Sequence, residues 1–115
     1  MNDCLFCRII SGEIPSKKVY EDEHTYAFED INPQAPTHVL VIPKGPYVSF
    51  ADFSASATSD EIAGFMRAVG KVAKDLRLEA QGYRLLANMG EHSGQEVPHF
   101  HVHLFAGRPL GRMLT

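Results

Sequence analysis

The stretch His99-Phe100-His101-Val102-His103-Leu104 alternates imidazole side chains with apolar ones. Successive side chains of a β-strand point to opposite faces of its sheet, so this alternation predicts a strand over 99–105. The three histidines would share one face of the strand, and the apolar residues would share the other. The segment therefore predicts a sheet with one face buried in a core and one face that bears the reactive imidazole side chains.

The three histidines could also line a solvated strand face or chelate one metal ion. A strand rises about 3.4 Å per residue, which places the first and third histidines roughly 13–14 Å apart. Zinc–nitrogen bonds are only about 2.0–2.1 Å long. One straight strand cannot bring all three onto one ion, so we expect His99, His101 and His103 to have separate roles.

The loop that precedes this strand is suited to bind an anion. Residues 88–97 contain two glycines and the amide side chains of Asn88 and Gln95. Backbone N–H groups in such a loop can hold phosphate oxygens. Neutral imidazole is a nucleophile toward phosphorus, and protonated imidazole is an acid for a leaving group. The loop and the histidines together indicate phosphoryl or nucleotidyl transfer.

The rest of the chain predicts an α+β fold. Apolar spacing and turn residues predict a short helix over 4–11, a hairpin over 19–29, strands over 38–42 and 83–87, and a long helix over 58–76. A capping box of Thr58 and Glu61 marks the start of the long helix. Its apolar stripe is expected to face the sheet and comprises Ile62, Phe65, Met66, Val69, Val72, Ala73 and Leu76. Gly64 and Gly70 within it are expected to mark a close helix contact.

The whole chain of 115 residues is expected to form one domain, spanning residues 1–115. Its net charge is −3 and its basic residues are scattered, which argues against a nucleic-acid partner. No apolar run approaches the roughly 18–20 residues of a membrane span, and the N-terminus does not resemble a secretory signal. We therefore expect a cytoplasmic protein without a membrane partner.

The only cysteines are Cys4 and Cys7, in a C-x-x-C arrangement. A structural disulfide is not expected in a cytoplasmic chain. The pair could be half of a zinc site, a redox pair or two buried thiols. A redox motif would need a strand before the cysteines, for which the chain has no room.

Taken together, these segments resemble the histidine triad (HIT) family. Residues 94–105 are similar to the family signature, in which three histidines alternate with apolar residues. Residues 6–15 resemble its N-terminal segment, and residues 28–38 resemble its nucleotide-binding stretch. Gly107-Arg108-Pro109-Leu110-Gly111 is similar to the Hint branch, the purine nucleoside phosphoramidases. The resemblance covers nearly the whole chain and implies a HIT-like sheet of about five mostly antiparallel strands, with one long helix and a short N-terminal helix.

The resemblance also implies an enzyme that hydrolyses purine nucleoside 5′-phosphoramidates at the P–N bond. His101 would attack the α-phosphorus and carry the nucleotide as a covalent intermediate. His103 and His38 would bind the phosphate and assist the departing amine, while His99 would mainly support the site. The implied partners are a purine nucleotide and a second copy of the chain in a homodimer.

The resemblance assigns ten further residues to the substrate. Phosphate would be held by Asn88, Gly94, Gln95 and the backbone near Glu96, ribose by Asp30, and the base by Phe6, Ile9, Phe28, Ile31 and Leu40. The apolar residues of this set would form a core in most folds, and Asp30 could simply form a turn. Glu96 stands where Hint enzymes often have a serine, which places a carboxylate beside an anion site.

Some members of the family hold structural zinc with two N-terminal cysteines, the first triad histidine and a later histidine. Cys4, Cys7 and His99 match three of these ligands, but Pro46 stands at the fourth position. Structural zinc needs four ligands, so we expect no cofactor, with zinc at Cys4, Cys7 and His99 as the less favoured alternative.

Two other functions share these residues. One is a dinucleoside polyphosphate hydrolase, which would use the same nucleophile. The other is a nucleotide-binding regulatory module with weak catalysis.

Overall fold

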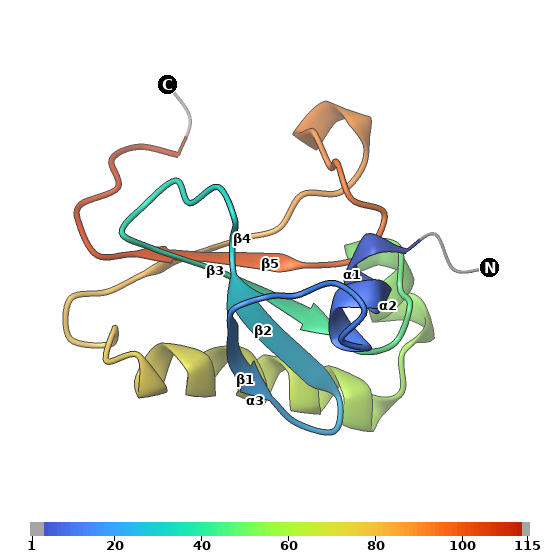
Figure 1. Ribbon diagram of the computed structural model, residues 1–115. Coiled ribbons are helices and arrows are strands. Elements are labelled where there is room, and N and C mark those ends of the chain that lie inside the picture. The colour runs from blue at the N-terminus through green and yellow to red at the C-terminus, as the bar shows by residue number, and fades with distance from the viewer. Residues whose placement is uncertain (1–3, 114–115) are drawn as a thin grey trace.

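A computed structural model describes residues 4–113 and contains one antiparallel sheet of five strands, in the order β1-β2-β3-β5-β4 (Figure 1). The strands are β1 (Lys18–Glu21), β2 (Thr25–Glu29), β3 (Thr37–Pro43), β4 (Arg84–Leu86) and β5 (Val102–Ala106). The helices are α1 (Leu5–Ile10), α2 (Phe50–Ser56), α3 (Ser59–Asp75) and the 3₁₀ turn η1 (Glu91–Ser93). Within residues 4–113, no helix has the length and hydropathy needed to cross a membrane. The predicted α+β architecture is confirmed.

Local sequence explains where the two predicted helices begin. The Sγ atom of Cys4 accepts a hydrogen bond from the backbone N–H of Cys7 and caps α1. At α3 the capping box forms in both directions: Thr58 Oγ1 accepts from the Glu61 N–H, and the Glu61 carboxylate accepts from the Thr58 N–H. These bonds satisfy N–H groups that a helix leaves unpaired in its first turn.

The long helix α3 covers one face of the sheet (Figure 1). The buried cluster between them also includes a residue of α2 and comprises Ala27, Val39, Val41, Phe53, Phe65, Val69, Val72, Ala73, Phe100 and Leu104. On the opposite face, α1 packs against β2 and β3 in a second cluster of Phe6, Ile9, Tyr26, Phe28, Leu40 and Ile42. Because β3 is covered on both faces, its sequence is an unbroken apolar run rather than an alternating one.

Strand β5 is shorter than predicted, because it begins at Val102 instead of His99. The last β3–β5 pair joins Val41 to Val102, and Pro43 at the end of β3 has no N–H to continue the ladder. The chain before β5 is held differently: the Phe100 N–H donates to the carbonyl of Tyr47. The predicted alternation nevertheless holds, since Phe100 is buried in the cluster beneath α3.

The helices differ from the prediction in two ways: one helix was not predicted, and the buried face of α3 is composed differently. Helix α2, capped by Ser49, was not predicted because it buries only Phe53 and so has no apolar stripe. On α3, the expected burial of Met66 and Leu76 is wrong: both are exposed, and Ala68 faces the core instead.

The glycines of α3 do not mark a contact between helices within the described part of the chain. A Cβ atom on Gly64 would lie 2.9 Å from Cδ2 of His24, in the turn between β1 and β2. His24 is half-buried in this turn. Apart from the adjacent residues and the backbone of its own helix, no atom of residues 4–113 lies within 4 Å of a Cβ atom built on Gly70.

Replacing Phe65 with alanine is expected to lower the free energy of unfolding by about 3–5 kcal/mol. The ring is almost fully buried and contacts the rings of Phe53 and Phe100, so its loss leaves a cavity between α3 and the sheet. Arg67→Ala, two residues further along the helix, removes an exposed side chain and should change stability by less than about 0.5 kcal/mol. Urea unfolding of both variants measures the difference, and equal losses would contradict this packing.

Candidate active site

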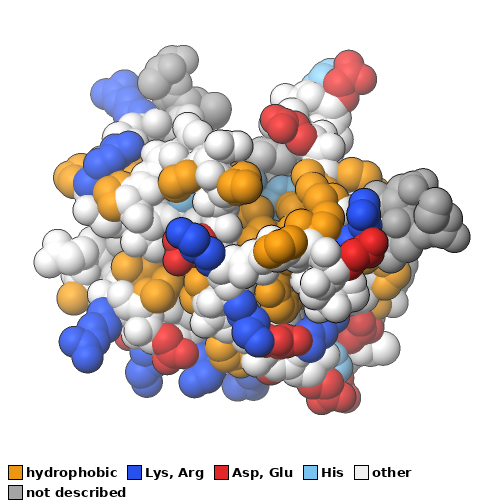
Figure 2. Space-filling view, viewed as in Figure 1, with side chains coloured by type: hydrophobic (Ala, Val, Ile, Leu, Met, Phe, Trp, Pro, Cys, Tyr) orange, Lys and Arg blue, Asp and Glu red, His pale blue; other side chains and the backbone are white. Residues whose placement is uncertain are grey.

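A groove of about 1090 Å³ opens on the face of the sheet away from α3. It lies between α1, the loop before β3 and the loop before β5. Figure 2 shows hydrophobic side chains gathered around a hollow in which histidine is visible. All ten residues that the resemblance assigned to the substrate line this groove: Phe6, Ile9, Phe28, Asp30, Ile31, Leu40, Asn88, Gly94, Gln95 and Glu96.

The groove also contains three of the four predicted catalytic histidines, namely His38, His101 and His103. His99 is 1% exposed and lies outside the groove, in contact with Cys4 and Cys7. The first triad histidine thus lies in a different environment from the other two, and their separate roles stay a prediction.

His101 is oriented by the backbone of the residue two positions before it. Its Nδ1 lies 2.7 Å from the carbonyl oxygen of His99. A carbonyl can only accept, so Nδ1 carries the proton and donates, and Nε2 carries the lone pair. The ring is nearly buried, and its centroid lies 5.2 Å from that of Phe6 in an edge-on contact. Because Nδ1 bonds the backbone, Nε2 is the nitrogen of His101 that can act as a nucleophile in the groove.

His38 and His103 form a hydrogen-bonded pair between neighbouring strands. His38 Nε2 lies 2.9 Å from His103 Nδ1 and 3.5 Å from Oδ2 of Asp30. On its other side, His38 Nδ1 accepts a 3.1 Å hydrogen bond from the backbone N–H of Gln34. Phe105 stacks on the His103 ring and lies against the His38 ring.

Burial lowers the pKa of both histidines of this pair. Desolvation lowers the pKa of His38, although the nearby Asp30 carboxylate opposes the shift. Desolvation, with repulsion from His101 and His38, lowers the pKa of His103 from 6.5 to about 4. At neutral pH both rings are therefore neutral, and each carries one proton.

Asp30, His38 and His103 also bring three potential metal-ligand atoms within 4.8 Å of one another. A ligating histidine normally donates its second ring N–H to an acceptor. His38 instead accepts at Nδ1 from the Gln34 N–H, so its proton is on the nitrogen that faces Asp30 and His103. These three residues form a hydrogen-bonding group in preference to a metal site.

The loop before β5 is shaped by the side chain of Gln95. Its Oε1 accepts from the Gly90 N–H at 3.0 Å, and its Nε2 donates to the carbonyls of Val48 and Val97 at 2.8 and 3.0 Å. Gly94, with a φ of +80°, closes the turn. The Gln95 amide therefore lines the groove while it fixes the backbone around it.

The sequence did not indicate every residue of the groove. Pro15, Ser16 and Lys17 line it because the chain after α1 runs beside β2. Gln34 also contributes, through its backbone N–H to His38. Every residue except proline has such an N–H group, so no side-chain pattern could have identified this contact.

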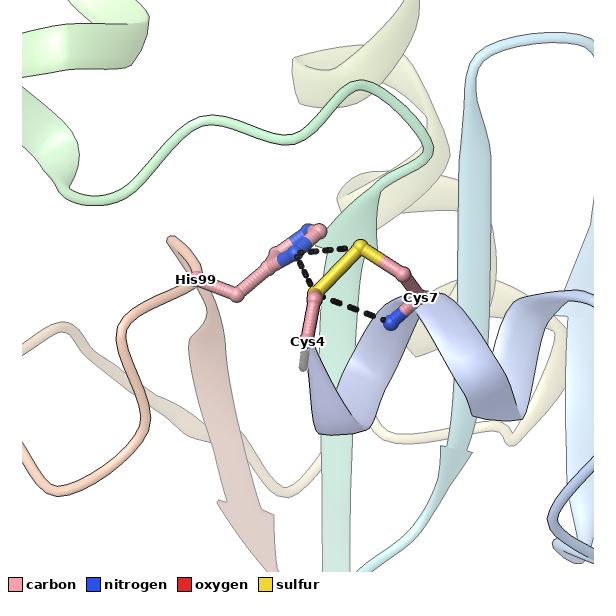
Figure 3. A group of neighbouring side chains, drawn as sticks. All are labelled: Cys4, Cys7 and His99. Atoms are coloured by element: carbon pink, nitrogen blue, oxygen red, sulfur yellow. Dashed lines mark hydrogen bonds between the residues drawn. A yellow bond between two sulfur atoms is a disulfide. The ribbon is translucent and has the colours of Figure 1, made fainter. Parts of the chain in front are cut away.

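Cys4, Cys7 and His99 form a second cluster at the start of α1 (Figure 3). A disulfide joins the two cysteines, so the expectation that they would be unlinked is wrong. His99 Nδ1 lies 3.3 Å from the sulfur of Cys4 and 3.8 Å from that of Cys7. The other nitrogen of the ring, Nε2, donates to the carbonyl of Pro43 at 2.9 Å, which leaves the Nδ1 lone pair facing the sulfurs.

This donor set fits three of the four ligands of a zinc site once the sulfurs are reduced. The three potential ligand atoms lie within 4.8 Å of one another. The bond from His99 Nε2 to Pro43 is the kind of support that orients a ligating histidine. The cluster can therefore hold a metal, although Pro46 supplies no fourth ligand.

Comparison with known proteins identifies the family. The family model described as HIT domain matches residues 11–110, and the chain belongs to this family. A 13.2 kDa HIT-like protein of Azospirillum brasilense is 63% identical over 111 residues, which cover 96% of this chain and 91% of the relative. The purine nucleoside phosphoramidase of Escherichia coli K12 is 46% identical, with 98% and 94% covered. A 14 kDa zinc-binding protein of Zea mays is 49% identical, with 92% and 83% covered.

Solved structures share the fold. A histidine triad protein from Clostridium difficile superposes with a TM-score of 0.89 at 43% identity, with 97% of this chain and 96% of the other covered. A HIT family hydrolase from Legionella pneumophila gives a TM-score of 0.87 at 43% identity, with 95% and 96% covered.

The depressed pKa of His103 predicts how the protein responds to acid. The unfolded chain binds a proton near pH 6.5, whereas folded His103 binds it only near pH 4. Stability from this group is therefore present above pH 6.5 and falls as the pH drops toward 4. NMR titration of the histidine side chains should give a His103 midpoint well below 6.5. A midpoint near 6.5 would contradict the described environment.

Proposed function

We propose that this protein hydrolyses purine nucleoside 5′-phosphoramidates to the nucleoside monophosphate and an amine. Three comparisons support a hydrolase of this kind: the HIT domain, the relative named purine nucleoside phosphoramidase and the neighbour named HIT family hydrolase. The observation that carries the proposal is the position of His101. His101 lines the groove, and because its Nδ1 bonds the backbone, Nε2 is the nitrogen that can attack. The centroid of the His103 ring lies 5.0 Å from that of His101.

The reaction proceeds by two displacements at phosphorus. In the first, His101 Nε2 attacks the α-phosphorus, the P–N bond breaks, and the leaving nitrogen takes a proton from solvent and departs as the amine. His103, whose proton is on Nε2, donates a hydrogen bond to the phosphate or the leaving nitrogen and keeps its proton. In the second, water attacks the phosphorus, the bond to His101 breaks, the nucleotide is released, and the proton lost by the water returns to solvent. Splitting one difficult step into two easier ones is the advantage of a covalent intermediate.

Other groove residues bind the nucleotide. Phe6, Phe28 and Leu40 are buried at its apolar end and enclose the base, with Ile9 beside them and the highly exposed Ile31 at the rim. Asp30 accepts from the ribose hydroxyls. The loop of Asn88, Gly94, Gln95 and Glu96 holds the phosphate oxygens through N–H groups, which stabilise the negative charge of the transition state.

The protein is proposed to act as a homodimer. Strand β4 is an edge of the sheet and is only three residues long, and Leu85 on it is exposed. Met66 on the outer face of α3 is also exposed. Pairing of two β4 edges would cover unpaired backbone groups that otherwise face solvent.

Replacing His101 with alanine is expected to lower kcat at least about a thousandfold, because the nucleophile is lost. Steady-state hydrolysis of an adenosine 5′-phosphoramidate of an aryl amine measures the loss. His92→Ala, an exposed histidine of the loop before β5, is the matched control and should keep wild-type turnover.

Four results would change this assignment. No turnover by the wild type, or full activity of His101→Ala, would reject phosphoramidate hydrolysis. Faster cleavage of diadenosine polyphosphates would favour the dinucleoside polyphosphate hydrolase. Nucleotide binding without cleavage of either substrate would favour the regulatory module.

Zinc is proposed not to be a resident cofactor, since Pro46 leaves the cluster of Cys4, Cys7 and His99 one ligand short. Reduced protein, dialysed against zinc and then buffer, is expected to retain well under one zinc per chain. Pro46→His supplies a fourth donor and should raise the content toward one. Elemental analysis gives both values, and one zinc per wild-type chain would overturn this inference.

A further inference from the structure

The segment that follows β5 packs on the loop that precedes β3. Figure 1 shows these two segments side by side at the same end of the sheet. Gly107 has a φ of +104°, and a Cβ atom on it would lie 2.6 Å from Cβ of Pro36. Arg108 Nη2 donates to the carbonyl of Gln34 at 3.3 Å. Gly107 thus lets the chain pass close to Pro36, and Arg108 bonds the loop at Gln34; the proposed function uses neither contact.

The loop that precedes β3 determines which nitrogen of His38 carries its proton. Gln34, whose carbonyl accepts from Arg108, donates its own N–H to His38 Nδ1 at 3.1 Å. A backbone N–H can only donate, so Nδ1 must be the unprotonated nitrogen. The proton of neutral His38 is therefore on Nε2, which faces two acceptors: Asp30 Oδ2 at 3.5 Å and His103 Nδ1 at 2.9 Å.

The direction of this hydrogen bond fixes the proton of His103 in turn. Since His38 donates to His103 Nδ1, neutral His103 carries its proton on Nε2, the nitrogen left for the groove. His103 then offers an N–H to a phosphate oxygen or an amine. If His38 lost the Gln34 contact, the bond could reverse. His103 Nε2 would then present a lone pair, which repels a phosphate oxygen.

We propose that Gly107 and Arg108 are positioning residues of the active site: by holding the loop at Pro36 and Gln34, they fix the tautomers of His38 and His103. The role of these tautomers in catalysis rests on the proposed function. The tautomers themselves can be measured without substrate, so the two inferences can fail separately.

The test is NMR of protein labelled with ¹⁵N-histidine, without substrate, at a pH where both rings are neutral. In the wild type, the long-range ¹H–¹⁵N spectrum should show His38 and His103 protonated at Nε2. Gly107→Ala should convert a measurable part of both rings to the Nδ1-protonated form, because the methyl group displaces the loop. Gly82→Ala is the matched control: Gly82 has a φ of +96°, but no neighbour in the described part of the chain lies within 4 Å of an added Cβ atom, so the spectrum should not change.

Kinetics give a second readout. Gly107→Ala should lower kcat about 10- to 100-fold, with little change in KM, as expected for a misplaced catalytic group. Arg108→Ala removes an exposed side chain that should not be needed for folding, and should lower kcat about two- to fivefold with a smaller shift in the tautomers. Arg108→Lys keeps a donor and should recover most of the loss.

Several results would overturn the proposal. If Gly107→Ala folds and its tautomers match those of the wild type, the proposal is wrong. If Gly107→Ala does not fold, unchanged tautomers in Arg108→Ala overturn the proposal instead. Lower kcat in Arg108→Ala with wild-type tautomers would also do so, because it would assign the arginine to direct substrate contact. If the wild type has no turnover, the proposed function fails while the spectra still decide whether the loop fixes the tautomers.

Discussion

The antiparallel pairing of β3 with β5 sets the relative positions of the histidines in the groove. It places His103 opposite Leu40 and His38 opposite Phe105, all on the face away from α3. The residue between them on β5, Leu104, is fully buried beneath α3. A shift of one residue would move the histidines into the apolar core, so burial of the other face stabilises the register on which the groove depends.

Hydrogen bonds with backbone groups then determine which ring nitrogen of these histidines carries the proton. The Pro43 carbonyl accepts from His99 Nε2, and the His99 carbonyl accepts from His101 Nδ1. The Gln34 N–H donates to His38 Nδ1, and His38 in turn donates to His103. His101 thus carries its proton on Nδ1, whereas His38 and His103 carry theirs on Nε2, because each ring meets a different fixed donor or acceptor. A covalent mechanism needs this difference, since the nucleophile must offer a lone pair where its neighbour offers a proton.

Much of this arrangement could be predicted from the sequence, because strong local patterns determine it. Alternation around Phe100 and Leu104 predicted the two faces of β5, and the capping box at Thr58 predicted the start of α3. The ten residues that the resemblance assigned to the substrate all line the groove, although it has further lining residues that the sequence did not indicate. The bond between His38 and His103 required the strand register, and the contact of Gln34 with His38 uses a backbone N–H that leaves no trace in the sequence. The short α2 was missed because its single buried side chain gives no periodic pattern.

The most direct test of the account is to trap the intermediate. Acid-free quenching of the wild type during turnover of an adenosine phosphoramidate, followed by proteolysis and mass spectrometry, should find an adenylyl group on His101. Its acid lability would identify the P–N bond of a nucleotidyl-histidine. An adenylyl group on His103 or His38 would contradict the assignment of the lone pair to His101 Nε2. Rapid turnover without any adduct on the protein would contradict the two-step mechanism itself.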